Sequence, residues 1–248
     1  MNQFSEIWVS LPLWGWGLAA VAAFLVGFSK TGIGNVALLA VAAMAATLPA
    51  KESTGAVLVM YLVADLVAIW VYRQHVEWKM IASLILPVLV GLAIGAVFLA
   101  WVSDLALKRT IGVIVLILLV MGLRPDKLKA ERRIVRYGYG SLSGFTTMVA
   151  NSGGPAFSLY LLASRFDKMR FLGTSAWFFF AVNATKLPIS ITLGIIRPSN
   201  ALFALIFTPI ILAGTWLGVW LVKRLNQKLF DGLVMAFVAV AGLYLLLG

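Results

Sequence analysis

Long apolar runs alternate with short polar stretches along the whole chain. Most of the runs approach the roughly 20 apolar residues that a helix needs to cross the hydrocarbon core of a bilayer. The pattern therefore predicts an all-α polytopic membrane protein with a single transmembrane domain, 1–248. The expected helical segments are 12–28, 33–48, 54–72, 80–101, 107–123, 137–150, 155–164, 171–195, 200–222 and 229–247.

The two halves of the chain resemble each other. Several residues recur 120 positions later, namely Gly34 and Gly154, Thr54 and Thr174, Lys108 and Lys228, Gly112 and Gly232, and Gly122 and Gly242. A duplication explains this, with repeat one at 12–123 and repeat two at 137–248. About five segments per repeat, an odd number, would make the second repeat enter from the opposite face, so we expect two inverted repeats.

The amino-acid composition excludes a soluble protein. The chain is 62% hydrophobic and 12% charged, against roughly 25% charged residues in soluble domains, and its mean hydropathy is +1.01. The first residues, MNQFSEIWVS, lack a positive stretch before the first apolar run. We therefore expect the first helix to remain in the mature fold.

The net charge of +11 is explained by the predicted membrane topology and does not indicate a nucleic-acid-binding surface. With both termini outside, fourteen of the 20 Lys and Arg residues fall on the cytoplasmic side. This is the asymmetry of the positive-inside rule, so we expect no nucleic-acid partner. The predicted cytoplasmic loops are 73–79, 124–136, 165–170 and 223–228.

Polar and glycine-rich stretches interrupt each half. Segment 155–164, after MVANSGGP, has ten residues, or about 15 Å of helix, half of a hydrocarbon core. We expect it to form a re-entrant hairpin with 137–150, meeting near the midplane at 151–155. Its counterpart is SKTGIGN, 29–35, where the longer arms leave full crossing open.

Helices that begin inside the membrane can bind an anion at their N-termini. Their first N–H groups and the positive end of the helix dipole point at whatever occupies the break, and we expect the amides of 152–154 to face such an anion. The alternative is that these glycines only allow turns and close packing. Close packing is our interpretation of the pairs Gly91 with Gly95 and Gly214 with Gly218, and Trp177 to Phe180 are interpreted as lipid-facing or core residues.

Three ionisable residues lie at membrane depth, where such residues are rare. Lys30 falls in the first break, Asp65 in segment 54–72 and Lys186 in segment 171–195. One hypothesis is that Lys30 or Lys186 holds an anion while Asp65 balances charge or carries a proton. The other is that Asp65 only neutralises a lysine. The candidate binding residues are Lys30, Thr31, Gly32, Gly34, Asn35, Thr147, Asn151, Ser152, Gly153, Gly154, Asn183 and Lys186, with Asp65 for coupling.

Enzyme and cofactor chemistry find no support in the residues. With no cysteine and one histidine, thiolate and multi-histidine metal sites are impossible. No nucleophile, base and acid form a recognisable constellation. We expect neither a metal nor another cofactor, and no catalytic residue.

Two pairs of stretches resemble the TauE/SafE family of sulfite-exporter-like permeases. They are GFSKTGIGN (27–35) with KESTGAVL (51–58), and GFTTMVANSGGP (144–155) with RFLGTSAWFFFAVNATKLP (170–188). The resemblance implies a secondary transporter of small anions, such as sulfite, sulfoacetate or related sulfonates and carboxylates. It also implies a bacterial or archaeal inner membrane.

We therefore expect a small-anion transporter that works by alternating access around a midplane site between the broken segments. The alternative is a passive anion channel, and an integral-membrane enzyme or an assembly subunit are further classes. The expected partners are the anion and the lipid bilayer, and a homodimer is left open. The identity of the anion, the coupling ion and the transport direction are also left open.

Overall fold

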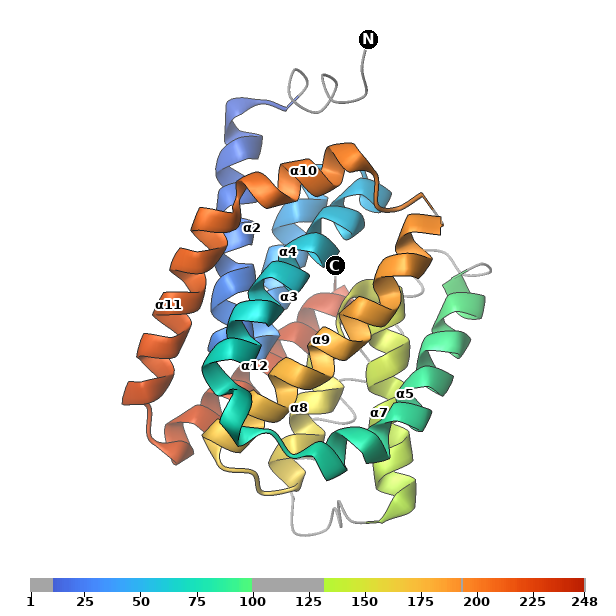
Figure 1. Ribbon diagram of the computed structural model, residues 1–248, viewed down its shortest axis with the longest axis vertical. Coiled ribbons are helices and arrows are strands. Elements are labelled where there is room, and N and C mark those ends of the chain that lie inside the picture. Colours follow the sequence, from blue (N-terminus) through green and yellow to red (C-terminus); the bar gives the residue numbers. More distant parts are fainter. Residues whose placement is uncertain (1–10, 100–131, 193, 248) are drawn as a thin grey trace. The chain divides into compact units, whose positions relative to one another are not determined.

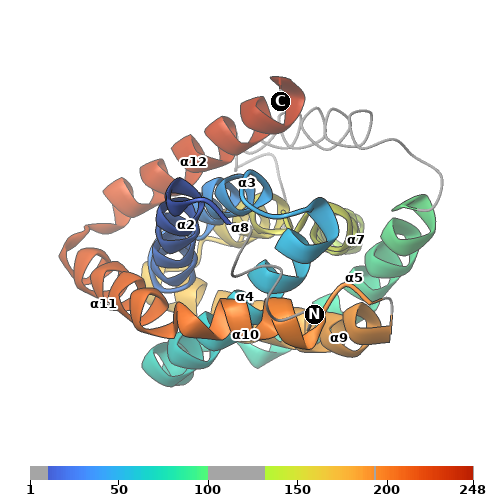
Figure 2. The ribbon, with the colours of Figure 1, turned by 90° about the horizontal axis from the view of Figure 1, so that it is seen from above.

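The computed structural model describes residues 11–99, 132–192 and 194–247, and over these residues it is all helical (Figures 1 and 2). The expected segments within these ranges are found as helix, apart from differences at their ends and in 200–222, whereas 107–123 and the end of 80–101 lie outside these ranges. The α-helices are α2 (Leu13–Thr31), α3 (Ala37–Ala45), α4 (Ala50–Tyr72), α5 (Trp78–Leu99), α7 (Arg133–Ala150), α8 (Gly154–Ala163), α9 (Lys168–Thr192), α10 (Pro198–Ile206), α11 (Thr208–Arg224) and α12 (Gln227–Leu247). Two 3₁₀ turns, η1 (Gly34–Val36) and η2 (Arg73–His75), complete the described helices.

Three of the described helical stretches are long and apolar enough to span a membrane. They are Leu13–Thr31, Glu52–His75 and Trp78–Phe98. The bent pair α10 and α11 would make a fourth span if it is counted as one. The helical stretches Gly34–Ala45 and Gly154–Ala163 are apolar but shorter. The second was expected to be short, whereas the first ends before the expected limit of 33–48.

The expected single segment 200–222 is wrong, because the chain bends by 51° between α10 and α11. In Figure 1, α10 and α11 visibly run in different directions. Pro209 has no N–H to donate to the Leu205 carbonyl, and its ring disfavours a continuous helix there. The Thr208 hydroxyl donates to that carbonyl instead, at 2.6 Å.

The start of α7 also differs from the expectation. The basic loop was predicted to extend through 136, but Arg132 is the N-cap and α7 begins at Arg133. Residues 124–131 of that loop lie outside the described ranges. Arg133 and Arg136 are therefore helical residues.

The helices group into two compact units, each drawn from both halves of the sequence. Unit 1 comprises 1–74 and 175–224, and unit 2 comprises 75–174 and 225–248. In unit 1, α2 packs against α11, α3 and α4. In unit 2, α5 packs against α7, and α8 packs against α7 and α12.

Glycines bring helices into close contact in both units. In unit 1, a Cβ on Gly214 would overlap the Phe24 carbonyl. α2 and α11 can therefore lie this close only because position 214 has no side chain. In unit 2, a Cβ on Gly91 would overlap the Ser141 carbonyl of α7. Gly95 and Gly218 also lie against neighbouring helices. The close-packing interpretation of both glycine pairs is confirmed.

α7 and α8 form an antiparallel hairpin within unit 2. The Ser143 hydroxyl donates to the Gly153 carbonyl at 3.0 Å, and the rings of Tyr139 and Tyr160 lie 6.0 Å apart. Residues before and after the break thus face each other in reverse order, as in a hairpin. Its entry from one face of a membrane stays a prediction.

The core of unit 1 joins the helices on either side of the first break. Small residues of α2, including Ala19 and Ala22, pack against Ala40 and Met44 of α3 and against α4 and α10. Because the α2 side chains are small, α3 and α4 can pack closely on α2. The last turn of α2, which carries Lys30, contacts α4 through Asp65 and Tyr61.

Candidate functional site

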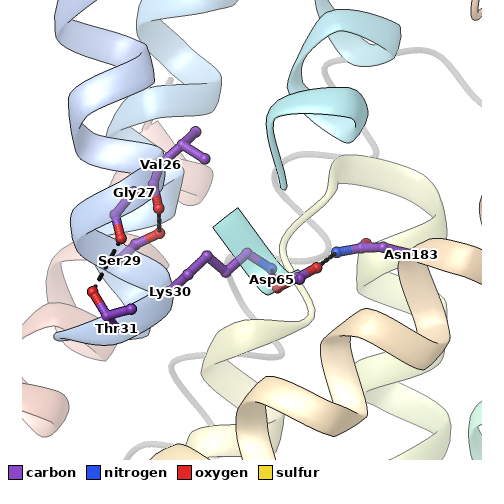
Figure 3. Close-up of polar contacts among 7 residues, drawn as sticks. All are labelled: Val26, Gly27, Ser29, Lys30, Thr31, Asp65 and Asn183. Atoms are coloured by element: carbon purple, nitrogen blue, oxygen red, sulfur yellow. Dashed lines mark hydrogen bonds and ion pairs between the residues drawn. The ribbon is translucent and has the colours of Figure 1, made fainter. Parts of the chain in front are cut away.

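A buried ion pair joins α2 to α4 in unit 1. The ammonium of Lys30 lies 2.8 Å from Oδ1 of Asp65, whose side chain is 0% exposed. Figure 3 shows the Lys30 side chain extending from the end of α2 toward Asp65, with Asn183 on the far side. Burying two charges is favourable only when each has close partners.

Asn183 completes the coordination of the carboxylate. Its side-chain amide, on α9, donates to Oδ2 of Asp65 at 2.7 Å. Each carboxylate oxygen of Asp65 therefore has one partner, a cation on one side and a neutral donor on the other. Three of the predicted residues meet here from three different helices.

Lys30 does not lie in the break, contrary to the sequence expectation. α2 continues through Thr31, so Ser29 and Lys30 belong to its last turn. The Ser29 hydroxyl donates to the Val26 carbonyl of the same helix at 2.8 Å. A cation at a helix C-terminus is favourable, because it interacts with the negative end of the helix dipole.

Two aromatic rings that sequence reasoning missed surround the Lys30 ammonium. It lies 4.4 Å from the ring centroid of Tyr61 and 5.1 Å from that of Phe179. Phe179 belongs to the run interpreted as lipid-facing or core residues, and its ring packs against Lys30 within unit 1. Both rings stand four residues before a member of the cluster, Asp65 or Asn183, and this spacing places them on the same helix face.

Lys186 is a second buried cation in unit 1. It lies three residues after Asn183 on α9, so the two side chains share a helix face, and it is only 4% exposed. Thr185, the repeat counterpart of Asp65, is exposed, and its hydroxyl donates to the Ala181 carbonyl of its own helix. Thr185 therefore does not join the cluster.

The first break itself is held by neighbouring helices. The Thr31 hydroxyl donates to the Thr215 carbonyl of α11 at 2.8 Å, and the Tyr72 hydroxyl donates to the Thr31 carbonyl at 2.6 Å. Gly32 follows as the C-cap of α2, Gly34 begins η1, and Asn35 is 3% exposed. These residues place the break directly beside the ion pair along the chain.

The second break, in unit 2, ends α7 with a left-handed residue. Asn151 has φ 51°, and the amides of Asn151 and Ser152 donate to the Thr147 and Thr146 carbonyls, at 3.1 and 3.2 Å. The expectation that the Ser152 amide faces an anion is therefore wrong, because this amide caps α7. α8 begins at Gly154 with Pro155 in its first turn, the position where proline is favourable.

The predicted site residues thus fall into two groups. Lys30, Asp65 and Asn183 are brought into contact in unit 1, which also contains the first break and Lys186. The second group, from Thr147 to Gly154, lies in unit 2. Within the described ranges, no group of three or more His, Cys, Asp or Glu residues is placed to hold a metal ion.

Comparison with known protein families assigns the chain. The model described as "Sulfite exporter TauE/SafE" matches residues 19–245. The chain belongs to the TauE/SafE family. No curated protein and no solved structure gave a match.

Membership of the TauE/SafE family gives the general function. The chain is a multi-pass membrane transporter and not an enzyme, and the substrates of the family are sulfur-containing anions. The long apolar helices of the described residues fit a membrane protein of this family. The resemblance drawn from the two pairs of sequence stretches is confirmed.

Proposed function

We propose that this TauE/SafE member is a secondary transporter of a small anion, either sulfite, a sulfonate such as sulfoacetate, or a related organic anion. The observation that carries the proposal is the Lys30–Asp65–Asn183 cluster at the end of α2. A charged pair in a membrane protein marks a functional site by default, because it costs stability to bury. The adjacent break, 32–35, supplies irregular backbone that suits a ligand.

Lys30 is the proposed anion-binding group. Its ammonium is held from one side by Asp65 and is flanked by the faces of Tyr61 and Phe179. The side chain is 10% exposed, whereas that of Asp65 is 0% exposed, so an anion would reach the cation rather than the carboxylate. Lys186, near Asn183 on α9, is the second proposed cation.

Asp65 is the proposed coupling residue. An anion on Lys30 would lie close to the Asp65 carboxylate, and two like charges about 5 Å apart repel by about 3 kcal/mol at an effective dielectric constant of ~20. A proton on Asp65 would remove this repulsion. Uptake of a proton and binding of the anion would then favour each other, because coupling between sites is reciprocal.

The repeat organisation and alternating access remain part of the proposal. The α2–α11 and α5–α7 pairs are both packed through glycines, which is what a duplication would produce. Two compact units that draw helices from both halves support movement of rigid bodies, as in other transporters built from repeats. Participation of Gly153 and Gly154 in the same site stays a prediction.

Transport by purified protein in proteoliposomes tests the proposal. We expect saturable uptake of radiolabelled sulfite or sulfoacetate and counterflow when the vesicles are preloaded with unlabelled anion. Lys30→Gln should abolish both, whereas Lys228→Gln, which removes an exposed charge from α12, should not. Linear, non-saturating flux without counterflow would favour the channel, and transport by Lys30→Gln equal to wild type would remove Lys30 from the site.

A further inference from the structure

A groove opens between the C-terminal parts of α4 and α11, both in unit 1. Its volume is about 600 Å³, and it lies outside the Lys30–Asp65–Asn183 cluster. The residues that line it are Val67, Trp70, Val71, Arg73, Gln74, Thr215, Trp216, Val219 and Lys223.

The groove is mostly apolar and is basic at one end. Its walls include two tryptophans, Trp70 and Trp216, which are 65% and 70% exposed. Two exposed cations, Arg73 and Lys223, belong to the lining, which contains no carboxylate. The lining therefore offers apolar contact and two positive charges to one occupant.

The two kinds of surface are ordered along the helices. Arg73 directly follows the end of α4, and Lys223 lies in the last turn of α11. Trp70 and Trp216 precede these cations by three and seven residues, so they lie further from the helix ends by about 5 and 10 Å. An occupant would place an anionic group at the helix ends and an apolar chain along the helices.

We propose that this groove binds an anionic phospholipid, with the phosphate on Arg73 and Lys223 and an acyl chain against Trp70 and Trp216. Charge complementarity selects the headgroup, and the exposed aromatic walls select a lipid over a soluble anion. The predicted topology puts both cations at the cytoplasmic face, where anionic lipids attract basic residues. Interaction with the helix dipole would account for the basic residues but not for the apolar groove beside them.

Native mass spectrometry of the purified full chain tests the proposal with two lipids, phosphatidylglycerol and phosphatidylcholine. Wild type should retain phosphatidylglycerol in preference to phosphatidylcholine. Arg73→Gln/Lys223→Gln should weaken phosphatidylglycerol binding by about tenfold or more, because both cations that attract the anionic headgroup are lost. The matched control is Arg224→Gln/Lys228→Gln, which removes two exposed charges outside the lining and should change the preference little.

A second variant tests the apolar part without changing charge. Val67→Phe fills the groove from α4, and it should reduce phosphatidylglycerol binding while both cations remain. Four results would overturn the proposal: equal retention of the two lipids, equal losses in the two double variants, unchanged binding by Val67→Phe, or displacement of the lipid by glycerol phosphate at the same concentration. Dimers that disappear on filling the groove would assign it to a second copy of the chain and would also overturn the proposal.

Discussion

Lys30 and Asp65 form an ion pair of 2.8 Å across two helices of unit 1, and the carboxylate is completely buried. Such a pair is weak evidence for stabilisation, because removing two charges from water offsets much of their attraction. Breaking it by removing one partner is costly, since the other charge stays buried. This asymmetry allows a structural pair to be distinguished from a functional one.

The first prediction concerns stability. Lys30→Met or Asp65→Leu alone should lower the free energy of unfolding by about 3 to 5 kcal/mol, whereas the double variant should lose less than either single change. Chemical denaturation in detergent, followed by fluorescence, measures the cycle. The double variant should nevertheless fail to transport. If the double variant transports normally, Lys30 and Asp65 only neutralise each other and the proposed site is wrong.

A second prediction concerns pH. Because protonation of Asp65 removes a negative charge beside the bound anion, affinity for a sulfonate should rise as pH falls. A sulfonate is the suitable probe, since its own charge does not change over this range. Asp65→Asn should bind with little dependence on pH, whereas Asp231→Asn on α12 should behave like wild type. Titration by isothermal calorimetry at several pH values makes the comparison, and a pH dependence retained in Asp65→Asn would exclude proton coupling at this residue.

The third prediction concerns the amide on α9. Asn183→Ala removes the donor to Oδ2 of Asp65, and a hydrogen bond to a buried charge contributes about 1.5 to 3 kcal/mol. Thermal unfolding in detergent should detect this loss. Thr185→Ala, two residues further along the same helix and exposed, should have little effect. Equal melting temperatures for the two variants would contradict the assigned contact.

Packing between α2 and α11 gives a fourth prediction. A Cβ at Gly27 would lie 2.9 Å from the Ile211 carbonyl carbon and from the Thr215 amide nitrogen, so Gly27→Ala must separate the helices. We expect a loss of about 1 to 3 kcal/mol. Gly17→Ala in the same helix meets nothing within 4 Å and should be neutral or stabilising. The reverse order of stability would mean that α2 and α11 do not pack as described.

The fifth prediction separates backbone shape from binding at the second break. Asn151 has φ 51°, a conformation that glycine adopts easily and branched residues resist. Asn151→Gly should therefore be tolerated better than Asn151→Val, for which we expect a loss of about 1 to 2 kcal/mol from the backbone conformation. Transport measured on Asn151→Gly then tests the Asn151 side chain without strain in the backbone. Unchanged transport would remove the Asn151 side chain from the proposed binding residues.

Features that depend on local sequence were predictable. The helical segments follow from apolar runs, because unpaired backbone groups are excluded from hydrocarbon and a helix pairs them internally. The breaks near 32–35 and 151–154 follow from clustered glycines, amides and hydroxyls. Gly91 and Gly214 were recognised as packing residues because small residues let helices approach in membranes.

Features that depend on what a residue meets across space were missed. Nothing local showed that α2 would continue through Lys30, or that Tyr61 and Phe179 would flank its ammonium. Only their spacing, four residues before Asp65 and Asn183, could have suggested them. The Ser152 amide was also misassigned, because whether an amide caps the preceding helix depends on the φ of Asn151.

The sequence by itself determined the membrane class, the positions of most helices and breaks, and the rare charges at depth, since hydropathy and glycine content act locally along the chain. Only the tertiary structure decided which charges meet. Lys30 and Asp65 are 35 positions apart, and Asp65 and Asn183 are 118 positions apart. The packing of small residues on α2 brings α2 and α4 together, and with them the cation and the carboxylate. Long-range packing of this kind leaves no periodic signal in the sequence. The sequence therefore indicated the residues of the cluster but not the contacts between them.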